Sequence, residues 1–173
     1  MQYIIYNPHK NPGGRQGSIM YKLKQERGIV PCTNYADLQR LEQLALPTIE
    51  VMQDYFAESN TALVFLYEKD LQPKNSPLRN VDGINYDHFN TVTQRSVCAV
   101  GLDREVLYKD KCAEIVPAML LHLLAHSFEG PGHGAEFTAR EDYLLMEYET
   151  LTGRHLAAVV ESGDGSGPSV ITD

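Results

Sequence analysis

The most apolar segment of the chain spans residues 112–127, and its sequence, CAEIVPAMLLHLLAHS, restricts the fold more than any other feature. A helix built from these residues has little polar surface, so we expect it to lie at the buried centre of the fold. Pro117 falls early enough to be accommodated in the opening turns of such a helix. The full chain has 173 residues, which is enough for a single domain with a hydrophobic core around this helix.

Hydrophobic periodicity predicts the elements around the apolar helix. Helices are expected where apolar residues recur at spacings of three and four, and strands where short runs are rich in β-branched and aromatic residues. Pro47 is expected to kink or restart the first helix. The expected order is a strand at residues 2–6, a helix capped by Asn34, strands at residues 61–67 and within residues 91–102, the apolar helix, and a helix at residues 135–152.

Charge is distributed unevenly along the chain. The net charge is −8, but residues 1–30 carry five basic residues and one acidic residue, so this segment has a net charge of +4. Residues 7–17 are rich in turn residues and lack the Gly-Lys-Ser/Thr ending of a phosphate loop, so we expect a loop with no helix close behind it. The expected parts are a basic, turn-rich arm at residues 1–33, a main domain at residues 34–156 and a flexible, Gly/Ser/Asp-rich tail at residues 157–173.

Composition also narrows the classes of function. A general nucleic-acid binder is usually basic overall, so contact with DNA is expected only through the basic arm, whose charges more often form a solvated surface. The longest stretch without a charged residue, residues 115–128, is too short to cross a bilayer, so we expect no membrane span. The three cysteines include no CxxC pair, and residues 1–10 do not resemble a secretory signal. We therefore expect reduced thiols and a cytoplasmic location.

Three of the six histidines lie within twelve residues: His122, His126 and His133. Helix positions four apart lie on one face, so the first two can present their imidazoles to one point. The Gly-Pro-Gly sequence at residues 130–132 permits a reversal that returns the third histidine to that point. Three neutral imidazoles with an open fourth position are the ligands of a catalytic zinc site. The alternative is that the first two are core histidines, hydrogen-bonded to the backbone or to a carboxylate.

The segment HLLAHSFEGPGHGAEF resembles the active-site segment of the SprT-like zinc metallopeptidases, whose pattern is HExxH, a loop of variable length and HGxxF. His122 and His126 match the first two ligands, and His133 with Gly134 and Phe137 matches the closing element. The resemblance covers roughly a third of the chain. It implies an α+β, minimal zincin-like fold, in which a small mixed sheet packs on a buried active-site helix and a following C-terminal helix. It also implies Zn2+ held by the three histidines, and a peptide or protein as substrate.

The chain departs from this family directly after the first histidine, where Leu123 replaces the glutamate that serves the family as general base. Loss of a general acid–base typically costs about 10²–10⁴-fold in rate. Glu129, between the second and third ligands, is the candidate substitute base, and Glu136 is a candidate partner of a ligating imidazole. The alternative for both is an ordinary solvated carboxylate.

Three classes of function remain open from the sequence. The chain is a metallopeptidase-like hydrolase with weak or absent activity, a pseudoenzyme whose zincin cleft holds a peptide or protein partner, or a metal-free interaction module. In the second class, an extended peptide adds to the sheet edge through main-chain hydrogen bonds, without catalysis. Peptidase activity that appears only in a Leu123→Glu variant would identify the natural chain as a binding protein.

Overall fold

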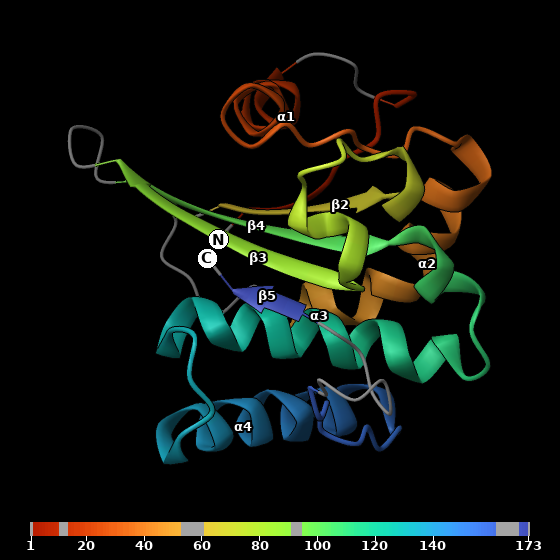
Figure 1. Ribbon diagram of the computed structural model, residues 1–173. Helices are drawn as coiled ribbons and strands as arrows, with labels where there is room; N and C mark the ends of the chain where they lie inside the picture. Colours follow the sequence, from red (N-terminus) through yellow and green to blue (C-terminus); the bar gives the residue numbers. More distant parts are fainter. Residues whose placement is uncertain (1, 11–13, 53–60, 91–94, 162–169, 173) are drawn as a thin grey trace.

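The computed structural model describes residues 2–10, 14–52, 61–90, 95–161 and 170–172. Its centre is a mixed sheet with the strand order β1-β2-β4-β3-β5 (Figure 1). β1, β2 and β4 are parallel neighbours, β3 runs antiparallel to β4, and β5 runs parallel to β3. The strands are β1 (Gln2–Ile5), β2 (Thr61–Tyr67), β3 (Gly83–Asn90), β4 (Arg95–Asp103) and β5 (Val170–Thr172).

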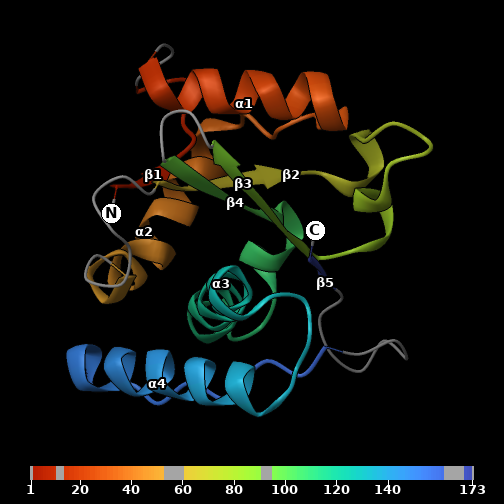
Figure 2. The ribbon, with the colours of Figure 1, turned by 90° about the vertical axis from the view of Figure 1, so that its left-hand side faces the viewer.

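Helices cover both faces of this sheet. They are α1 (Gly14–Arg27), α2 (Tyr35–Met52), α3 (Cys112–Glu129) and α4 (Ala135–Thr152). α1 lies on one face, whereas α2 and α3 lie on the other, and α4 packs on α3 on the side away from the sheet (Figure 2). α3 is therefore enclosed between the sheet and α4, and its residues 116–126 are all buried.

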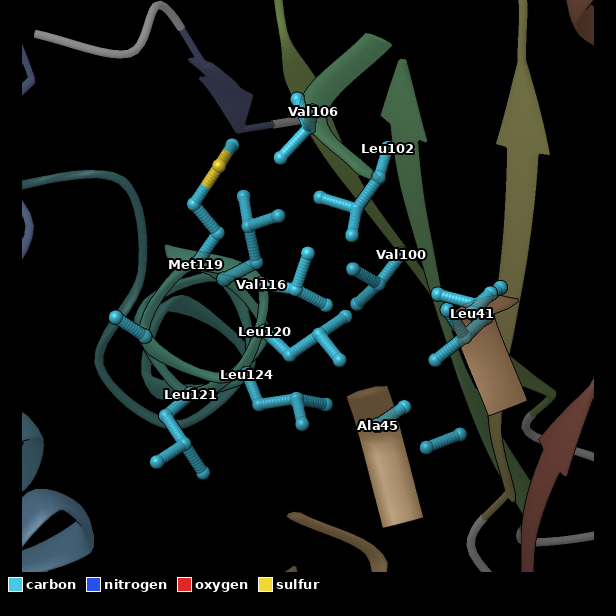
Figure 3. Packing of buried hydrophobic residues seen from close by; sticks show 14 of the residues in the cluster. Leu41, Ala45, Val100, Leu102, Val106, Val116, Met119, Leu120, Leu121 and Leu124 are labelled. Carbon is cyan, nitrogen blue, oxygen red and sulfur yellow. The ribbon is translucent and has the colours of Figure 1, made fainter. Parts of the chain in front are cut away.

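The main hydrophobic core lies between the sheet and the helices α2, α3 and α4. Leu120 and Leu124 point from α3 into the space between that helix, β4 and α2, where Val100 and Ala45 also lie (Figure 3). A smaller core on the opposite face packs α1 against the sheet. β2 is buried along its whole length because both faces are covered, and this explains why its sequence is a continuous apolar run.

Several sequence expectations are confirmed. The fold is of the α+β type, with a mixed sheet on a buried central helix. α4 has the predicted bounds, and Asn34 caps α2, since its Oδ1 accepts the backbone N–H of Asp37 at 3.0 Å. α2 does not restart at Pro47 but continues through it. The part of the expected helix beyond Met52 lies outside the described residues.

Other expectations are wrong. A helix does follow the N-terminal loop, because α1 begins at Gly14. Only a few apolar residues of α1 are partly or fully buried: Ile19, Met20 and Leu23. The sequence pattern of this helix is therefore weak, and the helix is stabilised mainly by packing on the sheet. β3 is a separate strand that the sequence did not resolve, and β5 arises within the region expected to be a flexible tail. No helix among the described residues is both long enough and apolar enough to span a membrane.

Candidate metal centre

The three histidines predicted as ligands converge on one point. α3 places His122 and His126 one turn apart on the side that faces α4, and their ring centroids lie 4.9 Å from each other. Gly130, with φ of +80°, ends the helix in a conformation that favours glycine. The loop that follows returns His133, whose ring centroid lies 4.9 Å from that of His126 and 5.5 Å from that of His122.

Glu161 completes this group, which we call the histidine cluster. Its Oε2 lies 2.7 Å from Nε2 of His122 and 3.1 Å from Nε2 of His126, and it also contacts Nε2 of His133. One ligand atom from each of the four residues lies within 4.8 Å of the others, so the group could hold a metal ion. Sequence reasoning missed Glu161, because it follows His133 by 28 positions, at the start of a Gly/Ser-rich stretch.

In His122 and in His126, the second ring nitrogen, Nδ1, contacts a hydrogen-bond acceptor outside the cluster. Nδ1 of His122 lies 2.5 Å from Oε2 of Glu141, a buried residue of α4, and Nδ1 of His126 lies 2.7 Å from the carbonyl oxygen of Gly130. Such contacts fix the ring orientation and direct Nε2 to the metal in histidine sites. Glu136, the sequence candidate for this role, is exposed in the first turn of α4, and Glu141 makes the contact instead.

The donor set suits a cation. A carbonyl oxygen only accepts, so Nδ1 of His126 donates to Gly130, and Nε2 of the neutral ring carries a lone pair that faces the carboxylate of Glu161. Two acceptors in contact repel each other unless a proton or a metal ion lies between them. Burial lowers the pKa of His122, but its hydrogen bonds with Glu141 and Glu161 outweigh burial, so that its pKa is raised overall. The cluster therefore attracts positive charge.

Phe137 packs the cluster from the side of α4. Its ring stacks on His126 with a centroid distance of 4.3 Å and an interplanar angle of 29°, and it meets His122 edge-on at 5.1 Å. Because Phe137 is itself buried, it excludes water from one side of the imidazoles and limits their rotation. This contact gives a physical role to the phenylalanine of the HGxxF element.

Two positions matter for a general base: Leu123, directly after the first histidine, and Glu129, the candidate substitute. Leu123 is fully buried, and its Cδ1 would lie 3.2 Å from a Cβ atom added at Gly83 of β3, so the side chain packs against the sheet. Its carbonyl oxygen accepts from Nδ2 of Asn85 at 3.0 Å. Glu129 accepts from Nε of Arg140 at 3.1 Å. An apolar side chain thus stands at the position where the resemblance to the SprT-like peptidases would place a general base, and the candidate substitute is engaged in an ion pair.

A second group of metal-ligand side chains lies near the ends of β2 and β4. Cys32, Asp37 and Glu68 also bring their ligand atoms within 4.8 Å of one another. Arg104 lies between the two carboxylates, with Nε 2.9 Å from Oδ2 of Asp37 and 3.5 Å from Oε1 of Glu68. We call these residues the arginine cluster.

The basic N-terminal residues lie away from the histidine cluster. Lys22 and Lys24 are exposed on α1, on the face of the sheet opposite to α3 (Figure 2). Lys10 pairs with Glu42 at 2.5 Å. The expected contact of this arm with DNA stays a prediction.

Comparison of the chain with known protein families, with curated proteins and with solved structures found no match. The geometry of the histidine cluster is therefore the main indication of function.

Proposed function

We propose that the protein is a zinc-binding, metallopeptidase-like protein with weak or no peptidase activity, in which the metal centre serves binding rather than cleavage. The observation that carries this proposal is the convergence of three Nε2 atoms and one carboxylate oxygen within 4.8 Å. Imidazole nitrogens with a carboxylate oxygen suit Zn2+, whereas Mg2+ and Ca2+ prefer sites made of oxygen atoms alone. Bonds of about 2.0–2.2 Å to zinc require only small movements of these ligands.

The number of protein ligands supports binding over cleavage. Structural zinc sites usually have four protein ligands, whereas catalytic sites have three and keep one position open. Glu161 would take that fourth position beside His122, His126 and His133. When bound, zinc would act as a Lewis acid and would link α3, the loop after it and the segment after α4. The protein's own part is to orient the rings through Glu141 and Gly130.

The missing base supports the same conclusion. Leu123 has no proton to give or take, and its buried position against β3 leaves no room for a carboxylate without burying a charge. Loss of a general base alone costs about 10²–10⁴-fold in rate. We therefore expect peptide hydrolysis by this chain to be weak or absent, even when the metal is bound.

Metal content tests the zinc proposal directly. Plasma mass spectrometry of the purified, untagged protein should find one zinc per chain, and His126→Ala should lose it. His155→Ala is the matched control, because His155 is an exposed histidine outside the cluster. Absence of zinc from the natural chain after incubation with the metal would refute the proposal, as would an unchanged zinc content in His126→Ala.

A cleavage assay tests the second half of the proposal. The zinc-loaded protein should cleave an unfolded protein substrate no faster than His126→Ala does. If the natural chain is clearly faster, and Glu129→Ala removes that activity while Glu136→Ala does not, the chain is a hydrolase with a relocated base. That result would replace the binding role with a catalytic one.

A further inference from the structure

α3 is apolar on all sides where it carries the histidines. Its residues 116–126 are all buried, and the two histidines are the only polar residues among them. Figure 3 shows Met119, Leu120 and Leu121 leaving the helix in different directions. Hydrophobic burial has no direction, so a helix that is apolar all round gains nearly the same free energy from burial at one rotation about its axis as at another. Hydrophobic contact alone therefore sets the rotation of α3 only loosely.

The metal centre, in contrast, depends on this rotation. Atoms at the outer radius of a helix, about 5–6 Å from its axis, move by about 1 Å when the helix turns by about 10°. The side chains of a metal site have to be held to within about 0.5 Å of the required geometry. His122 and His126 lie on α3, whereas His133 and Glu161 lie outside it. A rotation of this size would therefore shift the first two ligands together, away from the other two.

A buried amide on β3 supplies directional contacts to this helix. Asn85 is fully buried, and its Nδ2 lies 3.0 Å from the backbone carbonyl oxygen of Leu123 and 2.9 Å from Oγ of Ser127. Leu123 and Ser127 are one turn apart on α3, each directly after a histidine of the cluster. An amide nitrogen has two hydrogens, so it can donate to both oxygens at once. Because hydrogen bonds depend on angle as well as on distance, the two contacts fix this turn of α3 against β3.

The hydrogen bonds continue from Ser127 into the sheet. Oγ of Ser127 donates to Oδ1 of Asp87 at 3.1 Å and lies 2.7 Å from Sγ of Cys98. Asp87 follows Asn85 by two positions on β3, and Cys98 lies opposite Asp87 on β4. Side chains of two neighbouring strands therefore hold Ser127. We call Asn85, Asp87, Cys98 and Ser127 the amide network.

The amide network is not what stability alone would favour. Among the described residues, Oδ1 of Asn85 has no hydrogen-bond partner, although it is buried. A buried polar atom without a partner costs free energy, and an apolar side chain at this position would avoid that cost. What an apolar side chain cannot supply is a directional donor to α3. The orientation of the helix therefore explains the amide better than its stability does.

We propose that Asn85 and Ser127 are positioning residues for the metal centre, which fix the rotation of α3 so that its two histidines face the other ligands of the cluster. This inference rests on the proposed zinc site. Loss of a direct hydrogen-bond partner of a ligating imidazole typically costs about 10–100-fold in metal affinity. Asn85 and Ser127 act through the backbone of α3 instead, so their removal should cost less.

The test separates metal binding from stability. Asn85→Val removes both ends of the amide and suits a strand, while Leu123 keeps its helical N–H partner and Ser127 keeps Asp87. The metal-free variant should therefore unfold at a urea concentration close to that of the natural chain. Its affinity for zinc, measured by competition with a chelator of known affinity, should fall about 5-fold. The visible absorption of bound Co2+, which reports the geometry of the ligands, should also change.

Thr61→Val is the matched control. Thr61 of β2 is also a buried residue whose side-chain oxygen has no partner among the described residues, but β2 lies two strands away from β3. This variant should change neither the zinc affinity nor the Co2+ spectrum. A loss of affinity equal to that of Asn85→Val would mean that any buried polar group of the sheet has the same effect, which contradicts a positioning role.

Variants at Ser127 decide the question if Asn85→Val does not fold. Ser127→Ala should lower the zinc affinity by less and with the same sign, and Ser127→Thr, which keeps the hydroxyl, should restore it. If the folded variants bind zinc with natural affinity and show the natural Co2+ spectrum, the amide network serves folding only and the proposal is wrong, whatever the change in stability. Absence of zinc from the natural chain would overturn the zinc proposal instead.

Discussion

The histidine cluster and the arginine cluster meet the same geometric requirement, yet their chemistry differs. In both, atoms able to bind a metal lie within 4.8 Å of one another. In the arginine cluster, the guanidinium of Arg104 already lies against the carboxylate of Asp37 at 2.9 Å. In the histidine cluster, the carboxylate of Glu161 faces Nε2 of His122 and Nε2 of His126 instead, at 2.7 and 3.1 Å.

This difference shows that convergence of ligands is not enough to indicate a metal site. Burial raises the pKa of Asp37, but hydrogen bonds from Arg104 and Tyr108 outweigh burial and lower its pKa overall. The protein itself thus provides the positive charge that this carboxylate needs. The histidine cluster has only acceptors and titratable rings, so the positive charge that balances its carboxylate has to come from protons or from a metal ion. We therefore propose metal binding for the histidine cluster alone.

The largest expected effect is stabilisation of the fold by zinc, which should depend on the histidine cluster and not on the arginine cluster. Zinc at a concentration 100 times its Kd should stabilise the natural chain by about 2.7 kcal/mol, because the ion binds only the folded state. His126→Ala should abolish this gain, whereas Cys32→Ser should keep it. Urea unfolding with and without zinc measures both. A gain that depends on Cys32 rather than on His126 would reverse our assignment.

The second effect is a loss of stability when the arginine cluster is changed, and it does not depend on a metal. Arg104→Gln removes the cation from Asp37, whose side chain is 2% exposed, and should cost about 2 kcal/mol of unfolding free energy. The matched control is Arg140→Gln, since Arg140 is exposed to a similar degree, 35% against 33%. Its partner Glu129 is more exposed than Asp37, so this loss should stay below about 1 kcal/mol. Equal losses would mean that Arg104 is no more than a surface charge.

The two clusters also differ in how far the sequence could predict them. The proposed ligands His122, His126 and His133 fall within one helix and the loop after it, so local spacing is enough to bring them together. Asp37 and Arg104 are 67 positions apart and meet only because the fold brings α2 to the end of β4. No local pattern carries that contact.

The same reasoning explains which parts of the fold the sequence predicts correctly and which it does not. The sequence predicts α3 because its segment is the most apolar of the chain, and α4 because its apolar residues recur on one helix face. β5 is three residues long and pairs with a strand more than eighty positions earlier, so its existence depends on tertiary contacts rather than on its own sequence. Glu161 lies on the same segment, and it was missed for the same reason.

The third effect concerns the outer contacts of the histidine cluster. Glu141→Gln keeps an acceptor oxygen near Nδ1 of His122 but removes the negative charge, so the ring becomes a weaker ligand. Zinc affinity, measured by competition with a chelator of known affinity, should fall about 10-fold. Glu149→Gln is the control, because Glu149 is an exposed carboxyl of the same helix. An unchanged affinity in Glu141→Gln would leave the carboxylate with a packing role only.

The smallest effect is a dependence on pH that belongs to the arginine cluster. A carboxyl whose folded-state pKa is lowered, as that of Asp37 is, stabilises the fold above its unfolded pKa of about 3.9, and this contribution is lost as the pH falls through the folded pKa. The natural chain should therefore exceed Asp37→Asn in stability most at pH 6–7, and the difference should shrink below about pH 4. Urea unfolding across this range, with a chelator present, measures the difference, and Asp110→Asn controls for the loss of an exposed carboxyl. If the difference in unfolding free energy stays constant with pH, then the hydrogen-bond geometry at Asp37, rather than its negative charge, accounts for the contribution of its contact with Arg104.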